Sequence, residues 1–105
     1  MISFTNLAKA TSKEDLYKLL SKGICRGCNL KNADLSHADL RSTDLKGANL
    51  SGANLSNSIL DNSNLELSNL TSATLNNASL KNVNLSGAIL LEADFRNADL
   101  TNTRI

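Results

Sequence analysis

The chain has 105 residues, enough for one domain, and 41% of them are hydrophobic. Only 3% are aromatic and there is no Trp or Pro, which argues against a core built around large rings. The formal net charge of +1 excludes a strongly basic nucleic-acid binder and a strongly acidic mimic on bulk charge alone, and no apolar run is long enough to span a membrane.

The N-terminal segment 1–22 differs from the rest of the chain. Its opening lacks the basic region, apolar stretch and small-residue cleavage site of a secretory leader, so we expect a cytoplasmic protein. Thr11 or Ser12 followed by acidic residues is typical of a helix start, and Gly23 is typical of a helix stop. The sequence therefore predicts a short amphipathic helix at about 13–22.

Residues 23–105 carry a repeat of five residues without any insertion. A large apolar residue, usually Leu, follows a small residue by two positions and an Asp or Asn by one, and Asn or Gly often comes two positions later, as in NADLS, HADLR and GANLS. A period of five fits neither a helix nor a strand. It predicts a solenoid in which the chain runs extended for about three residues and then turns at a corner.

Four such corners would close a square coil of twenty residues, with coils stacked at roughly 4.8 Å. This register puts Leu above Leu in interior columns and leaves no room for a ligand. It also brings charges of opposite sign together in adjacent coils, namely Arg41 with Asp61 and Lys46 with Glu66. Corner Asn residues would stack as an amide ladder, and inward Ser and Thr hydroxyls would need carbonyl partners.

The open end of such a solenoid must be covered, and a terminal helix is the usual cover. We therefore interpret residues 1–22 as a cap. A basic helix could instead contact anionic lipid, but the apolar face is too short. The side chains expected to plug the first coil are Phe4, Leu7, Leu16, Tyr17, Leu19 and Leu20.

Cys25 and Cys28 form a C-R-G-C motif on inward positions of the first coil. Zinc would need two further ligands, but the single His, His37, falls on an outer corner and no second CxxC exists, so no metal or cofactor is expected. Buried reduced thiols and a local disulfide that tightens the first coil both remain open. The lack of a leader favours reduced thiols.

The five-residue units resemble those of the pentapeptide-repeat family over residues 23–105. The resemblance implies a right-handed four-sided β-helix, here of about four coils. The family is heavily represented in cyanobacteria, and some photosynthetic members carry a similar C-x-G-C motif that is sometimes oxidised. Other members mimic DNA and bind DNA gyrase, but they are long acidic rods, so this short, near-neutral chain makes gyrase binding the alternative function and not the leading one.

The leading expectation is a non-enzymatic structural or protein-interaction module with an unknown protein partner. Catalysis needs a cleft, whereas a convex tower offers none. The acidic residues most suggestive of carboxylate pairs occupy the outward slot of the repeat and are explained by it: Asp34, Asp39, Asp44, Asp94 and Asp99. We expect neither nucleic-acid binding nor membrane insertion.

Several apolar residues stand in slots that are polar elsewhere, namely Ile59, Leu67, Ile89 and Leu91. Ile89 and Leu91 flank Leu90 and predict a small adhesive patch. The last coil ends on Leu90, Phe95, Leu100 and Ile105, so its edge could pair with another chain. The sequence thus predicts either a weak homodimer through the C-terminal coil or a monomer sealed by Phe95, with an interaction patch drawn from Ile89, Leu91, Phe95, Leu100 and Ile105.

Overall fold

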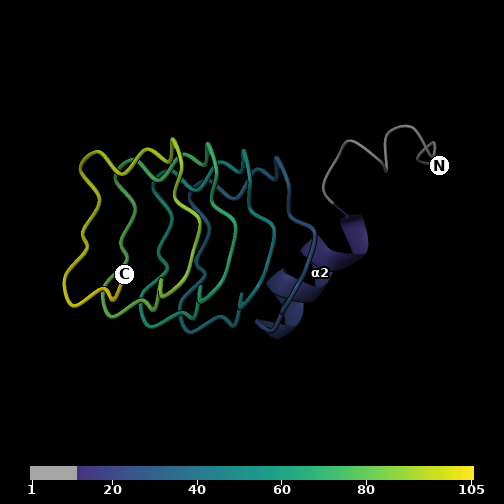
Figure 1. Ribbon diagram of the computed structural model, residues 1–105. Helices are drawn as coiled ribbons and strands as arrows, with labels where there is room; N and C mark the ends of the chain where they lie inside the picture. Colours follow the sequence, from purple (N-terminus) through teal and green to yellow (C-terminus); the bar gives the residue numbers. More distant parts are fainter. Residues whose placement is uncertain (1–11) are drawn as a thin grey trace.

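The computed structural model describes residues 12–105, which form one helix followed by a stack of coils (Figure 1). The helix, α2 (Lys13–Lys22), begins after Ser12, whose side chain accepts a hydrogen bond from the Asp15 N–H at 3.2 Å. It ends at Gly23, which has the left-handed φ of 69°. The helix predicted at 13–22 is therefore confirmed. Among the described residues, the coils are joined by isolated parallel bridges, and no strand extends beyond a single bridge.

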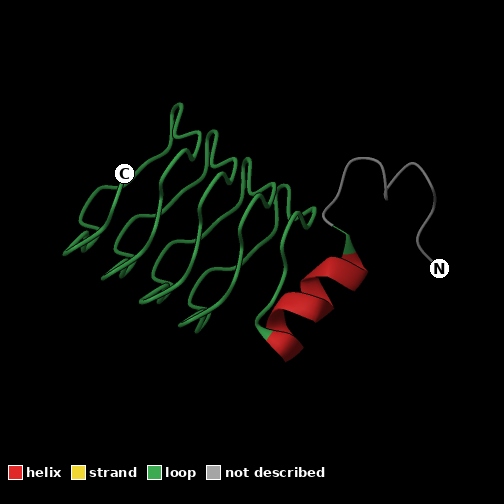
Figure 2. Cartoon of the chain, turned by 60° about the horizontal axis from the view of Figure 1, so that its bottom comes forward, coloured by secondary structure: helices red, strands yellow, loops and turns green. Residues whose placement is uncertain are grey.

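Every bridge joins residues twenty positions apart, from Ile24 with Asp44 to Asn84 with Arg104. Within this ladder, the Leu30 N–H donates to the Asn49 carbonyl at 2.8 Å. Figure 2 shows the resulting coils lying parallel to one another, with α2 at one end of the stack. The twenty-residue coil predicted from the repeat is confirmed.

Each five-residue unit ends in a tight turn. At the first of these after Leu30, the Ala33 N–H donates back to the Leu30 carbonyl at 3.1 Å, and Asn32 between them has a φ of 60°. A turn of this kind requires a left-handed backbone at its third residue, which Gly and Asn adopt most easily. The Asn and Gly residues of the repeat are therefore the corners of the coil.

The outward Asp or Asn residues also shape the turns. The Ser36 N–H donates to Asp34 Oδ1 at 3.1 Å, and the Ser56 N–H donates to Asn54 Oδ1 at 3.0 Å. Such a side chain accepts a bond from its own backbone two residues on, which fixes the start of a turn. This slot is thus a structural part of the repeat and not simply a solvated position.

Stacked Leu side chains fill the interior. All of the largest fully buried side chains among residues 12–105 are Leu, and Leu45, Leu65 and Leu85 form one of the columns. Burial of each such side chain contributes about 1.5–3 kcal/mol. The same columns are less well covered in the last coil, where Leu100 and Ile105 are exposed.

Between coils, the surface contacts follow the predicted register only in part. Lys46 Nζ lies 3.6 Å from Glu66 Oε2, as predicted. The Asn82 amide donates to the Asn62 amide oxygen at 3.3 Å, which is one step of the predicted ladder. Arg41 instead pairs with Asp39 of its own unit, with Nη2 and Oδ2 2.7 Å apart.

The cap covers the first coil with fewer side chains than predicted. Leu19 is only 1% exposed and Leu16 packs against the core, whereas Leu20 is 59% and Tyr17 73% exposed. The assignment of Leu20 and Tyr17 to the plug was therefore wrong, because a helix lying on a narrow coil buries a single row of side chains. The other two residues assigned to the plug, Phe4 and Leu7, lie outside the described residues.

The cap also completes the hydrogen bonds of the first coil. The Asn29 N–H donates to Asp15 Oδ2 at 2.8 Å, and the Ser12 N–H donates to the Asn29 carbonyl at 3.1 Å. One coil later, the equivalent Asn49 N–H donates to the Cys28 carbonyl of the coil before it. The start of α2 therefore takes the place of a preceding coil.

Candidate functional site

The structure divides the predicted interaction patch into two separate surfaces. Ile89 and Leu91 occupy non-core positions on one side of the last coil and are 52% and 66% exposed. Phe95, Leu100 and Ile105 belong instead to the core columns of the same coil, at the end of the stack. The side and the end of the stack are consequently two different candidate sites.

Leu67 lies next to Gly87, in the segment of the next coil that leads to Ile89 and Leu91. A Cβ placed on Gly87 would lie 2.7 Å from Leu67 Cδ2, so the Leu67 side chain lies across Gly87 in the next coil. Ile89 is two residues beyond Gly87, a distance of about 6.6 Å along an extended chain, and Leu91 follows at the same spacing. We call Leu67, Ile89 and Leu91 together the side surface.

The backbone at Leu67 is unusual for its residue type. Twelve non-glycine residues among 12–105 have a positive φ, and Leu67, at 60°, is the only apolar one. Leu67 is 58% exposed, and the three other residues of its corner column are Gly27, Gly47 and Gly87. A left-handed backbone costs a side chain such as Leu about 1–2 kcal/mol. Neither turn geometry nor core packing therefore explains the choice of Leu here.

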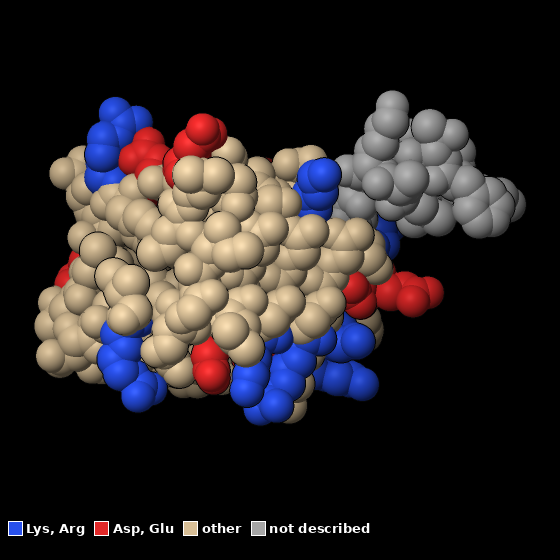
Figure 3. Space-filling model, in the orientation of Figure 1, with Lys and Arg blue, Asp and Glu red and all other residues tan. Residues whose placement is uncertain are grey.

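Carboxylates border the side surface in sequence. Glu66 precedes Leu67 and pairs with Lys46, while Glu92 follows Leu91 and lies 3.4 Å from the Ser72 hydroxyl that donates to it. Figure 3 shows one side of the stack on which charged side chains lie mainly along the edges and leave a broad uncharged area between them.

The outer face of α2 is a second exposed apolar region. Tyr17 and Leu20 are three residues apart and hence neighbours on the helix surface, and exposed Ile24 follows the helix. Lys13 precedes Tyr17 by one turn and is exposed. We call Tyr17 and Leu20 the helix surface.

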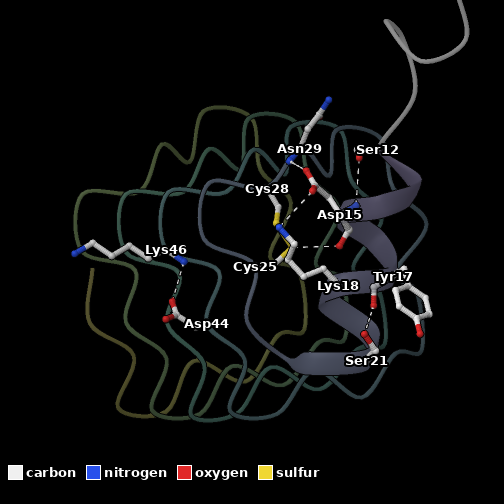
Figure 4. Close-up of a disulfide and its surroundings, with 10 residues drawn as sticks. All are labelled: Ser12, Asp15, Tyr17, Lys18, Ser21, Cys25, Cys28, Asn29, Asp44 and Lys46. Carbon is white, nitrogen blue, oxygen red and sulfur yellow. Dashed lines mark hydrogen bonds and ion pairs between the residues drawn. A yellow bond between two sulfur atoms is a disulfide. The ribbon is translucent and has the colours of Figure 1, made fainter. Parts of the chain in front are cut away.

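Cys25 and Cys28 are joined in a disulfide, with their Cα atoms 5.3 Å apart. Figure 4 shows the pair facing α2, where Cys25 Sγ lies 3.2 Å from the Asp15 carbonyl oxygen. The preference for reduced thiols, which rested on the missing leader, therefore differs from the structure. Both residues are buried on inward positions, as the repeat predicts.

The outward acidic side chains differ in the groups that donate hydrogen bonds to them. The Arg41 guanidinium donates to Asp39 and lowers the pKa of that carboxyl, and Arg96 lowers the pKa of Asp94 in the same way. The Ser36 hydroxyl, which donates to Asp34, lowers the pKa of Asp34. The hydrogen bonds that lower these pKa values stabilise the ionised carboxylates. A carboxylate that stays ionised suits turn formation and ion pairing, and not proton transfer to a substrate.

No other described group forms a chemical centre. Within residues 12–105, no three His, Cys, Asp or Glu side chains are placed to hold a metal ion, and His37 is a corner residue with a φ of 61°. In the same part of the chain, no helix is long and apolar enough to cross a bilayer.

The residue that sequence reasoning missed is Asp15. The sequence assigned it to the first turn of the helix, whereas its carboxylate holds the first coil through Asn29. The signal available was an acid in the first helical turn, which is common to many helices and does not indicate a contact fourteen residues away.

A family model for pentapeptide repeats, comprising eight copies, matches residues 20–52, 48–87 and 78–105. The matched stretches cover more than half of the chain, which therefore belongs to the pentapeptide-repeat family. Proteins of this family are generally non-catalytic. No match was found among curated proteins.

Solved structures similar to this chain share the right-handed quadrilateral β-helix. A pentapeptide repeat protein from Nostoc Pcc 7120 is 32% identical, with a TM-score of 0.74 over 90% of this chain and 76% of that one. A pentapeptide repeat protein from the thylakoid lumen of Arabidopsis thaliana is 37% identical, with a TM-score of 0.67 over 69% of this chain and 50% of that one. The present chain thus spans about half the length of the Arabidopsis protein.

A third similar structure is QnrB1, a plasmid-mediated fluoroquinolone resistance protein. It is 26% identical to this chain, with a TM-score of 0.61 over 76% of this chain and 42% of that one.

Proposed function

We propose that the chain is a non-catalytic protein-interaction module whose side surface binds a partner protein. The observation that carries the proposal is Leu67, an exposed apolar residue in a left-handed backbone. Strain of this kind persists when the rest of the fold enforces it, and it clusters at functional positions. Exposed apolar residues that gather together, unlike scattered ones, mark interaction surfaces.

The rest of the structure supports binding over catalysis. Leu side chains fill the interior of the coils, and outward acidic side chains such as Asp34 and Asp39 serve turns and ion pairs. A rigid stack of coils offers its outer sides as an extended surface, which is how repeat proteins generally bind partners.

A capture experiment tests this function. The tagged wild-type chain, the variant Ile89→Ser/Leu91→Ser and the control Ile59→Ser would each be immobilised and exposed to an extract of the source cells. Ile59 is also an exposed apolar residue in the outward slot, but it lies on a different side of the coil. We expect a protein retained by the wild type and by Ile59→Ser but lost from Ile89→Ser/Leu91→Ser. Equal retention by all three would refute the side surface as the binding site.

DNA gyrase binding is the second candidate function, and the similarity to QnrB1 is the observation that favours it. The near-neutral charge disfavours it, because a DNA mimic must present a strongly acidic surface.

A further inference from the structure

Besides the end of the stack, where Leu100 and Ile105 are exposed, the described residues leave the side surface and the helix surface uncovered, and these two surfaces differ in the charges beside them. The side surface lies between Glu66 and Glu92, whereas the helix surface has Lys13 one turn before Tyr17. The side surface presents three large apolar side chains and the helix surface two. The two lie at different places on the stack, since α2 covers the first coil and Leu91 belongs to the last (Figure 1).

Because of this placement, one molecule cannot bring its own two surfaces together. A second copy can, by laying the outer face of its α2 against the side of the last coils. Leu20 and Tyr17 would then contact Ile89 and Leu91, and Lys13 would approach Glu92. Opposite charges at the rim of an apolar contact favour one orientation and one partner over others.

We propose that the partner of the side surface is the helix surface of a second copy of this chain. This inference rests on the proposed function, since it names the partner for the same surface. The contact joins two different surfaces, so it is heterologous, and the assembly retains one free side surface at one end and one free helix surface at the other. It would be weak, because two or three side chains on each copy cover much less than the roughly 800 Å² per partner of a standard interface.

Blocked variants test the pairing directly. Leu91→Ser blocks the side surface and Leu20→Ser blocks the helix surface, and both residues are exposed, so neither change removes a core side chain. By sedimentation velocity over a hundredfold concentration range, we expect the average mass of the wild type to rise with concentration. Each variant alone should associate at least about tenfold more weakly, given the apolar area of one Leu.

A mixture of Leu91→Ser and Leu20→Ser gives a sharper test than either variant alone. An equimolar mixture of the two variants retains one intact pair of surfaces, so it should form dimers and nothing larger, with the affinity of the wild-type contact. Ile59→Ser is the matched control and should associate as the wild type does. Urea unfolding of each variant would show that the changes leave the fold intact.

A charge exchange tests the orientation. Glu92→Lys should weaken association by repelling Lys13, and the double variant Glu92→Lys/Lys13→Glu should restore it. Restoration is not expected from a nonspecific apolar contact.

A wild-type mass of one chain throughout, or a mixture that stays monomeric, would overturn the inference. Association that is lost in Leu100→Lys but kept in Leu91→Ser would also overturn it, and would place the contact at the last coil, where the sequence predicts a homodimer. Capture of another protein by the side surface, together with a monomeric wild type, would leave the proposed function standing while refuting this partner.

Discussion

At the scale of single residues, the corner of each five-residue unit decides which side chain the fold tolerates. Leu67 occupies a corner at a φ of 60°, a backbone at which Asn is comfortable and Leu is not. It also covers Gly87, which has no side chain to collide with it. Stability and surface chemistry therefore favour different residues at this position.

Leu67→Asn should raise the free energy of unfolding by about 1 kcal/mol, because Asn relieves the left-handed strain. The reverse change at an ordinary corner, Asn77→Leu, should lower it by a similar amount, since Asn77 has a φ of 62°. Urea unfolding measures both. A destabilised Leu67→Asn would mean that contact with Gly87 outweighs the strain. If the proposed function holds, this stabilised variant will capture its partner less well.

Buried hydroxyls offer a second test at this scale. Ser58 Oγ donates to the Leu55 carbonyl at 2.6 Å, whereas the buried Ser63 and Ser68 hydroxyls have no such partner among the described atoms. Ser68→Ala should therefore raise the free energy of unfolding by about 1 kcal/mol, while Ser58→Ala should lower it by about 0.5–1 kcal/mol. Thermal or urea unfolding of the two variants side by side distinguishes these signs. Equal destabilisation would indicate that Ser68 has a partner after all.

At the scale of structural elements, two of the outward carboxylates are held in their ionised form by an arginine of the same unit. Hydrogen bonds from Arg41 and Arg96 lower the pKa of Asp39 and Asp94 in the folded chain. The unfolded chain then binds protons more readily than the folded one. The resulting stabilisation is fully present above the unfolded pKa of about 4 and is lost as the pH falls through the lower folded pKa.

We therefore expect the urea midpoint to fall as the pH drops below about 4. The double variant Asp39→Asn/Asp94→Asn should show a smaller fall, because Asn keeps an acceptor oxygen for the turn but cannot titrate. An unchanged pH profile in this variant would show that these two carboxylates do not contribute to the acid sensitivity.

The cap gives a prediction about a whole element. Leu19 is the one fully buried side chain of α2, so Leu19→Ala should lower the free energy of unfolding by about 2–4 kcal/mol. Leu20→Ala, its neighbour on the exposed side, should change it by less than about 0.5 kcal/mol. Urea unfolding of both variants checks this. A large loss in Leu20→Ala would mean that other parts of the chain cover this residue.

The sequence predicts the coil and the bounds of α2, because both depend on local patterns. A five-residue period allows few backbone paths, and Ser12 and Gly23 are ordinary helix ends. The sequence does not determine which Leu of the helix is buried, since Leu16, Leu19 and Leu20 all share a broad apolar face. That choice depends on the width of the first coil, a property of the assembled structure.

For the candidate site too, the sequence predicts what depends on local patterns and not what depends on the assembled structure. Ile89, Leu91 and Leu67 could be recognised individually as exposed, since they occupy slots that are polar elsewhere. Their grouping could not, because it depends on Leu67 reaching across Gly87 in the neighbouring coil. The spacing of Cys25 and Cys28 likewise allows both a disulfide and two thiols, so the sequence alone left their bond open.

At the scale of the whole molecule, the charges of this chain nearly cancel. Its 11 basic and 10 acidic residues include pairs in contact, such as Lys46 with Glu66 and Arg96 with Asp94. Paired charges of both signs produce a weak long-range field, unlike the uniformly negative field of DNA.

We therefore expect no inhibition of DNA gyrase and no relief of fluoroquinolone inhibition in a supercoiling assay, even with the protein in about hundredfold molar excess over gyrase, because a near-neutral surface cannot replace DNA electrostatically. QnrB1, a fluoroquinolone resistance protein, serves as the comparison in the same assay. Protection of gyrase by this chain would contradict the expectation and make gyrase binding the leading function.

The bridges between residues twenty positions apart have a consequence for changes in chain length. Removing five residues advances every later residue by one side of the square, yet small and large apolar residues still point inward because every unit has the same pattern. Removing one residue instead turns the next Leu outward and carries an Asp or Asn into the interior, at a cost of several kcal/mol for each carboxylate left unpaired. Growth or shortening of this molecule is thus quantised: whole units can be gained or lost while the interior survives, and single residues cannot.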